Sequence, residues 1–582
     1  MHFQIGEVRA HNDSEVRHIR HSEETRTLRP GDIVETFGHV FEWDQDCVPI
    51  ELCESWRGVG DPLCDDALRQ AFAGPSSSVG KDLLQTLEQR ADIQDDQSEA
   101  IRTFVDEIHQ APPSGIMATE EEVALAQAFF LDNSIQIMQA LLHYSLAGGF
   151  ASPRIVRTLA AVSYLVPHVR REDEGSSSHD LSHLLNSISK ASSDRTLSRL
   201  LETFQFVLDV MGCSAPAAPA HPIREENIKL SQECAHTSSQ THVSGTSELA
   251  YLLPGGEGWK STARVRLLHG VARWRAEERW KREGQTRSVE AGVPISQEDL
   301  AATLAAFSTI PIWCLHRLHL PPTQEQASAY LALWRHVGYY LGVSPKILLR
   351  YFSNTRTADK FLATAALHLF SDELTPSPSP PPSSSPSPSE SRSTILRGPT
   401  IPILVAVSNR PPLNTSLEYN IALTTHLLGT PLSAHLGLPR TSLRARLSMH
   451  AFLLVQRIPH VFASWYPRRA WLEKRRAVLR EGLMRSVRWN LGLRRTTFRP
   501  RTMVQDVGLE GEAGGGELAP GVVEEEGVKP DPARAKVLTK MWSEVWMEMV
   551  GVCVATFAVT GVVGYVGLGY LLNLARSWNR AY

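Results

Sequence analysis

The strongest constraint on the fold lies near the C-terminus, where residues 549–572 contain no charged side chain. A helix rises 1.5 Å per residue, so this run would extend about 36 Å, enough to cross the roughly 30 Å hydrocarbon core of a bilayer. Aromatic side chains flank it at Trp542, Trp546 and Trp578, as they do at membrane interfaces. We expect residues 546–574 to be a transmembrane tail anchor, and a buried core helix is the alternative.

The overall composition excludes several classes of protein. Lys and Arg total 59 against 63 Asp and Glu, a net charge of −4, which gives no sign of a nucleic-acid partner. The seven cysteines include no CxxC pair, which argues against a zinc module and against a disulfide framework. Residues 1–30 are rich in His, Arg and Glu, so we expect no cleavable secretory signal.

Low-complexity segments divide the chain. Residues 375–389 consist only of Ser, Pro and Thr, which cannot build a packed element. We expect a helical domain over residues 46–500 after an N-terminal extension, 1–45. Disordered insertions are expected near 170–194, 213–246 and 372–399, and a Gly/Glu-rich linker over 501–540 before the anchor.

The rest of the chain predicts an all-α fold, a large helical bundle. Residues 120–146 carry acidic side chains in the first turn and a wide apolar face. Residues 196–211 are apolar on nearly every side, which predicts a central helix. Residues 261–283 form another long helix, and a capping box at 323–326 begins the next one. The alternation typical of a strand is weak except at 402–407.

His269 is the first candidate for chemistry. It lies in the middle of a predicted helix, and the spacing places Arg266 and Arg273 on the same face. Such a histidine can ligate haem iron, and flanking arginines can pair with haem propionates. By spacing alone, a half-buried histidine on a basic face is the favoured explanation, because a lone histidine has no diagnostic spacing.

Arg199 and Thr203 form a second candidate pair, because i and i+4 positions project on one side of a helix. An arginine on so apolar a helix needs a partner, since an unpaired buried charge is costly. That partner is either a nearby carboxylate, Glu202 or Asp209, or a bound anion.

Other polar patterns carry weaker signals. We interpret the pairs His179/His183 and His316/His319 as surface histidines, and no protease, serine hydrolase or nucleotide-binding motif is present. Residues 457–501 hold 13 Lys and Arg, interleaved with tryptophan. Because the predicted span lies nearby, contact with an anionic membrane surface is favoured over nucleic acid.

Four segments together resemble a known family. RLLETFQFVLDVMG (199–212), VRLLHGVARW (265–274), PISQEDLAATLAAFSTIPIWCL (294–315) and AYLALWRHVGYYLGV (329–343) are similar to fungal mpaB-type oxygenases and bacterial latex-clearing proteins. GTPLSAHLGLPR (429–440) resembles a later helical region of that family. The resemblance covers roughly residues 46–457.

The resemblance implies an all-α fold around one haem b and oxidative cleavage of isoprenoid double bonds with dioxygen. It implies that His269 is the proximal iron ligand and that Arg199 and Thr203 lie on the other side of the haem, as cofactor-binding and catalytic residues. Arg266 would pair with a propionate. Arg335 and His336 also match family positions, for which no role is assigned.

The sequence departs from the family at one informative position. Latex-clearing proteins carry a lysine directly before the threonine, where it can cap the iron, whereas this chain has Glu202. A lysine-capped state is therefore not available here. The glutamate that serves those enzymes as a base has no counterpart that can be placed in this sequence.

The hypothesis from sequence is a membrane-anchored haem oxygenase with its catalytic domain in the cytosol. Its partners would be a lipophilic isoprenoid substrate, dioxygen and membrane lipid, and the endoplasmic reticulum is favoured over the mitochondrial outer membrane. A tail-anchored scaffold without catalysis and a haem protein of different chemistry remain alternatives.

Overall fold

The structure is a computed structural model of the chain. It describes residues 3–4, 16–93, 98–162, 188, 190–214, 247–284, 292–370, 399–411, 414–491, 495–502 and 531–578. The predicted insertion at 372–399 falls almost wholly outside these residues, as do most of 170–194 and 213–246. Of the linker predicted over 501–540, residues 503–530 also fall outside, whereas 532–540, expected to be linker, form the first turns of the helix α23 (Pro532–Trp578).

The described part of the chain is predominantly helical. Its strands are β1 (Phe3–Gln4), β2 (Arg17–His18), β3 (Ile33–Thr36) and β4 (His39–Glu42). The first helices are α1 (Ile50–Arg57), α2 (Pro62–Ala71), α3 (Leu83–Ala91), α4 (Glu99–Ile108), α5 (Glu120–Asp132), α6 (Ser134–Ala140), α7 (Ala147–Gly149) and α8 (Pro153–Val162). The later helices are α10 (Lys190–Val210), α12 (Glu257–Arg282), α13 (Gln297–Arg317), α14 (Gln324–Tyr340), α15 (Pro345–Tyr351), α16 (Thr355–Leu369), α18 (Thr400–Val407), α19 (Leu417–Leu428), α20 (Thr430–His435), α21 (Leu443–Trp465), α22 (Arg469–Asn490) and α23 (Pro532–Trp578).

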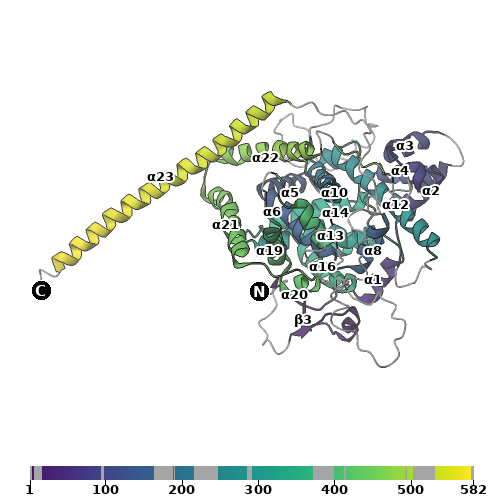
Figure 1. Cartoon of the computed structure of the whole chain (residues 1–582), viewed down its shortest axis with the longest axis horizontal. Helices are drawn as coiled ribbons and strands as arrows, with labels where there is room; N and C mark the ends of the chain where they lie inside the picture. Colours follow the sequence, from purple (N-terminus) through teal and green to yellow (C-terminus); the bar gives the residue numbers. More distant parts are fainter. Residues whose placement is uncertain are drawn as a thin grey trace.

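Helices α13 and α14 lie at the centre of the bundle, with α5, α10 and α12 around them (Figure 1). Both begin with capping boxes: Ser296 accepts from the Asp299 amide in α13, and Thr323 accepts from the Gln326 amide in α14. Apolar side chains cover most of their circumference, so neighbours pack on every side. The predicted all-α bundle is confirmed.

Three details differ from the sequence expectations. Residues 402–407 belong to helix α18, because a short apolar run buried on both sides fits a helix as well as a strand. Lys190–Asp194, expected within an insertion, form the first turn of α10. The N-terminal extension contains a four-stranded sheet of order β1-β4-β3-β2, in which β3 and β4 pair antiparallel.

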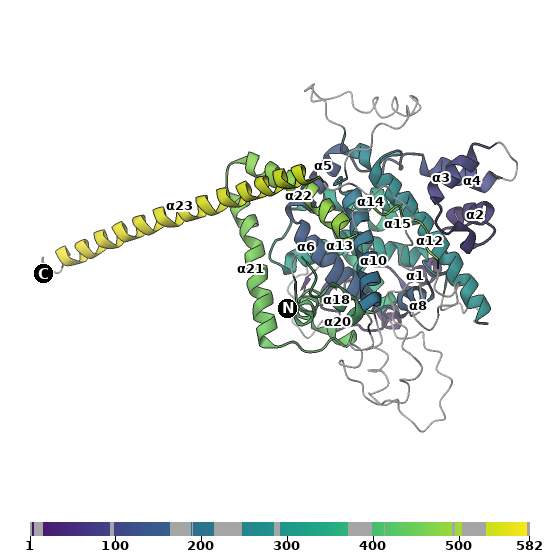
Figure 2. The same cartoon turned by 45° about the horizontal axis from the view of Figure 1, so that its top comes forward.

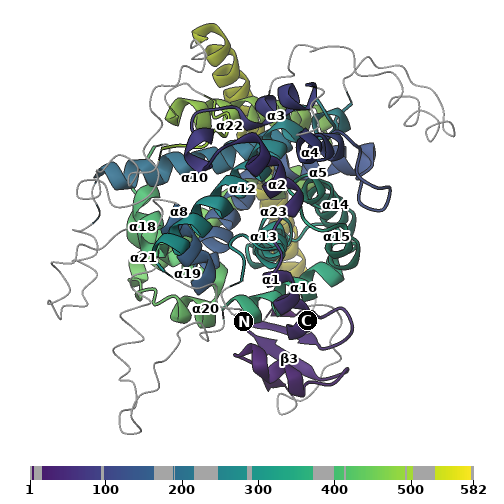
Figure 3. The same cartoon turned by 90° about the vertical axis from the view of Figure 1, so that its right-hand side faces the viewer.

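This small sheet packs against the edge of the helical body beside α1 and α16 (Figure 3). The Phe37 ring at the β3–β4 turn meets the Phe370 ring at the end of α16 edge-to-face, with centroids 5.3 Å apart. Val34 and Phe41 are fully buried in the main core. The extension is therefore part of the folded body.

Helix α23 extends away from the body as a single long rod (Figure 1). Its segment Pro532–Leu571 is long and apolar enough to cross a membrane. An 18-residue stretch within this segment has a mean hydropathy of 2.0, and almost none of that stretch is covered by protein. The first half packs on α21 and α22 through Phe462, Trp471, Val545 and Met549. The Trp471 Nε1 donates to the Val545 carbonyl at 3.0 Å.

One glycine allows α12 and α2 to approach closely. A Cβ at Gly270 would lie 2.5 Å from Leu68 Cδ1 and 2.9 Å from Cys64 Sγ, both buried in α2. Nothing lies within 4 Å of the equivalent position at Gly482 in α22.

We therefore expect Gly270→Ala to lower the free energy of unfolding by about 1–3 kcal/mol through overpacking. Gly482→Ala should be neutral or stabilise by up to about 1 kcal/mol, because alanine has the higher helix propensity. Urea unfolding of both variants measures the difference. Equal effects would show that α12 and α2 do not pack as closely as the structure indicates.

Candidate active site

An apolar cavity of about 400 Å³ lies in the helical body. Helices α10, α12, α13 and α16, the α6–α7 segment and the β3–β4 hairpin contribute its walls. The apolar side chains that line it include Leu146, Phe150, Phe206, Leu268, Leu304 and Phe307. A cavity of this size and character suits a lipophilic ligand.

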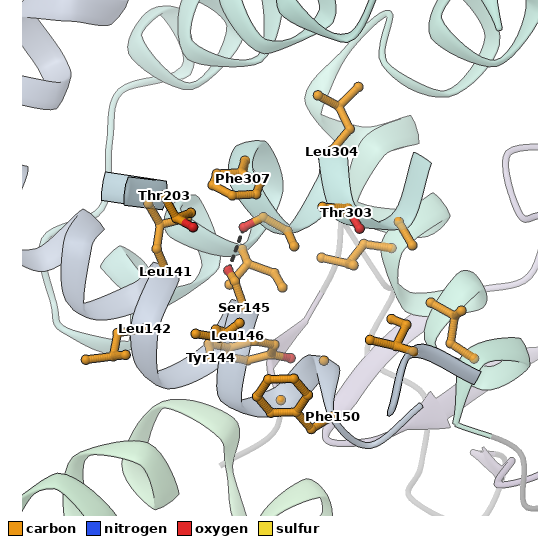
Figure 4. A pocket seen from close by; sticks show the side chains of 18 of the residues that line it. Leu141, Leu142, Tyr144, Ser145, Leu146, Phe150, Thr203, Thr303, Leu304 and Phe307 are labelled. Atoms are coloured by element: carbon orange, nitrogen blue, oxygen red, sulfur yellow. Dashed lines mark hydrogen bonds between the residues drawn. The ribbon is translucent and has the colours of Figure 1, made fainter. Parts of the chain in front are cut away.

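One wall comes from a turn of π-helix at Leu141–Leu146, between α6 and α7 (Figure 4). Such turns are rare inside α-helices and are frequent at functional sites. Leu141, Tyr144 and Ser145 of this turn all reach the cavity. The Ser145 hydroxyl donates to the Ala306 carbonyl of α13 at 2.6 Å, which joins two walls.

His269 borders one end of the cavity. Within the described residues its imidazole makes no hydrogen bond, and Nδ1 is buried. Burial lowers the pKa of His269 to about 4, and the positive charges of Arg273 and Arg199 act in the same direction. The ring is therefore neutral at physiological pH, with a nitrogen lone pair available to a metal.

Arg199 and Thr203 lie at the same end, so the structure brings the three predicted residues together. The Arg199 side chain is 34% exposed and pairs with buried Glu202 at 2.9 Å. Glu202 is also bonded by Arg501 from the C-terminal part of the domain. The carboxylate partner considered from the sequence is thus the one present. The Thr203 hydroxyl donates to the Arg199 carbonyl at 3.2 Å and faces the cavity (Figure 4).

A histidine and a tyrosine that the sequence did not reveal, His39 and Tyr144, also line the cavity. His39 of β4 is buried, and its Nε2 lies 3.2 Å from the Tyr144 hydroxyl. The His39 ring lies against Trp313, with centroids 4.0 Å apart. Burial lowers the pKa of His39 well below its usual value, and the charge of Arg317 adds to the effect.

Arg266 does not reach the cavity, which corrects the expectation that it pairs with a propionate beside His269. Its guanidinium donates to Asp61 at 2.7 and 3.1 Å and to Glu107 at 3.2 Å. Arg273, expected on the same face, is paired with Asp65 at 2.9 Å. Both arginines are buried between α12 and α2, because their carboxylate partners lie there.

Arg335 and His336 satisfy backbone groups at the ends of neighbouring segments. His336 lies between the Ala118 amide and the Leu252 carbonyl, at 3.3 and 3.1 Å. Arg335 donates to the carbonyls of Ile116 and Phe352. Neither lines the cavity, so their role is to hold loops against α14.

Of the two histidine pairs interpreted as surface residues, one lies in the described part of the chain. His316 and His319 are exposed at the end of α13, and His179 and His183 lie outside the described residues. In the part of the chain that the structure describes, no group of three or more His, Cys, Asp or Glu could hold a metal ion. His269 is thus a single ligand candidate rather than one member of a ligand cluster.

Comparison with known proteins gives one family match and one match to a solved structure. Residues 183–458 match the family described as "ER-bound oxygenase mpaB/B′/Rubber oxygenase, catalytic domain". This part of the chain is therefore similar to that family. The family is one of oxygenases, so the protein is an oxidoreductase.

A solved structure of latex clearing protein LCP in the closed state also matches. The two share 16% sequence identity at a TM-score of 0.41, over 74% of this chain and 91% of that chain. No curated protein sequence matches the chain.

We expect Arg266→Ala to destabilise the fold without changing the cavity. The variant leaves Asp61, whose side chain is 5% exposed, without its bidentate partner, which costs about 3–5 kcal/mol. Arg199→Ala is the control, because Glu202 keeps Arg501 and the pair is partly solvated, and about 1 kcal/mol or less is expected. Thermal unfolding compares them, and similar losses would contradict this assignment.

Proposed function

We propose that the protein is a membrane-anchored, haem-dependent oxygenase that cleaves a double bond of a lipophilic isoprenoid chain with dioxygen. The observation that carries the proposal is His269: a neutral imidazole that has no hydrogen-bond partner among the described residues, at the wall of an apolar cavity, in a segment that matches an oxygenase family. The apolar cavity supports the choice of substrate, because an isoprenoid chain has no polar group that needs a partner.

The residues at this end of the cavity fit haem b. His269 supplies the nitrogen that would hold the iron, and haem would supply the activation of dioxygen. Arg199 is the cation at the rim, and its partly exposed guanidinium retains donors beyond the single bond to Glu202. A propionate would therefore compete with Glu202 for Arg199, while Arg501 continues to neutralise Glu202.

The other residues bind and orient the substrate and exclude water. Leu268, Leu304 and Phe307 offer an apolar surface along the cavity. The hydroxyls of Thr203 and Thr303 are among the polar groups drawn at the cavity in Figure 4, from α10 and α13. We assign Arg199 and Thr203 as the catalytic candidates, with Thr203 able to donate to an oxygen atom once it releases the Arg199 carbonyl.

The apolar half of α23 is the proposed anchor, with the catalytic domain in the cytosol and the endoplasmic reticulum as the favoured membrane. Its arrangement suits the proposed substrate, since isoprenoid chains partition into bilayers. An enzyme held at the membrane meets them at a high local concentration.

We expect His269→Ala to abolish or strongly weaken haem binding, because it removes the iron ligand and leaves a gap beside the cavity. Haem per folded chain, read from the Soret band of the full-length protein in detergent, is the measurement. Arg199→Ala should weaken retention by about 1.5–3 kcal/mol, the value of a charge-assisted hydrogen bond.

His316→Ala and His319→Ala are matched controls for the histidine substitution, since both side chains are exposed at the end of α13. They should keep full haem. An unchanged Soret band in His269→Ala would overturn the ligand assignment. A wild-type protein that binds no haem would instead favour a scaffold without catalysis.

We expect Val559→Arg to weaken membrane insertion by about 2.5–3.5 kcal/mol, because it places a charge at the middle of the apolar half of α23. Extraction with alkaline carbonate measures the effect, and wild-type protein should stay in the membrane pellet. Release of the wild-type protein would show that α23 does not span the bilayer.

A further inference from the structure

Helix α21 carries an exposed apolar stripe along its whole length. Six of the side chains recur at helical spacing, so they lie on one side of the helix: Leu443, Leu447, Leu454, Ile458, Val461 and Trp465. Their exposed fractions range from 43 to 63%. Soluble surfaces rarely present such a continuous stripe, and its presence indicates an interaction surface.

The opposite side of α21 belongs to the core. Ala445, Met449 and Leu453 are buried, and α21 packs on α19, with the rings of Phe452 and Tyr419 5.9 Å apart. α21 therefore has a buried face that is separate from the stripe. α21 is apolar on two sides, and protein covers only one of them.

Arginines border the stripe. Arg444, Arg446 and Arg457 lie on the same helix, next to its apolar positions. In the part of the chain that the structure describes, no acidic side chain forms an ion pair with Arg446 or Arg457. Long cationic side chains beside an apolar face can extend their charge toward lipid phosphates while their stems stay in apolar surroundings.

The stripe is continuous with the proposed anchor. Phe462, near the C-terminal end of α21, packs with Val545 and Met549 of α23, where the apolar run begins. Figure 1 and Figure 2 show α23 leaving the body on the side where α21 lies, with α21 running across the direction of α23. A bilayer entered by α23 would meet the exposed side of α21.

We propose that α21 is a second membrane contact, an amphipathic helix that lies in the plane of an anionic lipid surface with its stripe inserted among the acyl chains. The inference rests on the anchor proposed for α23 and adds to it a fixed orientation. One helix that spans the bilayer leaves the body free to rotate and tilt, whereas a second, in-plane helix restrains both motions. The occupant of the stripe is lipid, because the anchor places the bilayer there and the border is cationic.

Depth-dependent quenching tests the proposal in the full-length protein. An environment-sensitive fluorophore is attached at Leu447→Cys or Leu454→Cys, in a background with Cys234→Ser and Cys553→Ser. The cysteines Cys47, Cys53, Cys64, Cys213 and Cys314 are buried and can remain. The protein is reconstituted in phosphatidylcholine/phosphatidylserine vesicles whose lipids carry a quencher near the headgroup or at the end of the acyl chain.

Two further sites calibrate the measurement. Leu349→Cys replaces a leucine on α15 that is also exposed, at 49%. Val559→Cys reports on the anchor. We expect the α21 probes to emit at shorter wavelength than the Leu349→Cys probe and to be quenched most strongly from the headgroup position. The Val559→Cys probe should be quenched most strongly from the acyl-chain end.

The outcomes separate the two proposals. Water-like, unquenched emission from α21 with a quenched Val559→Cys probe would overturn the in-plane helix and leave the anchor intact. Loss of quenching at Val559→Cys as well would overturn the anchor itself. Short-wavelength emission from α21 without quenching by lipid would mean that a protein surface, such as a second copy, covers the stripe, which also overturns the proposal.

Discussion

Two buried ion pairs set the rotation of α12, and the character of the cavity follows from that rotation. Arg266 and Arg273 lie about two helical turns apart and bind Asp61 and Asp65 of α2. Each carboxylate is nearly enclosed, so it fixes its arginine closely, and breaking either pair would leave a buried charge. With these two positions held on α2, Val265, Leu268 and His269 face the cavity. Arg266 and Arg273 of α12 thus face α2, whereas His269 of the same helix faces the apolar cavity.

That arrangement explains why His269 differs from the other buried histidines. His143 binds the Thr424 hydroxyl, and His336 bridges two backbone groups, so each has a structural partner. Burial lowers the pKa of all three, and the imidazoles are neutral. His269 alone of these three has no hydrogen-bonding partner among the described residues, and an unsatisfied buried nitrogen is costly unless a ligand completes it.

Much of the fold could be predicted from the sequence, because helical periodicity and capping boxes are local signals. His269, Arg199 and Thr203, proposed from motifs placed on those helices, all line the cavity. The partners of Arg266 could not be predicted, since Asp61 lies 205 residues away and no local pattern links the two. His39 was missed for the same reason: its strand is four residues long, and its partner Tyr144 is 105 residues distant.

Segments outside the family match also line the cavity. Thr36 and His39 come from the N-terminal sheet, and Phe498 comes from the segment that follows α22. This last segment is held against α10 by buried polar groups. Gln205 bonds both the amide and the carbonyl of Thr496 at 2.9 Å, and Arg501 binds Glu202. Glu202 therefore holds a wall of the cavity in place. That wall precedes α23, the proposed anchor, in the chain.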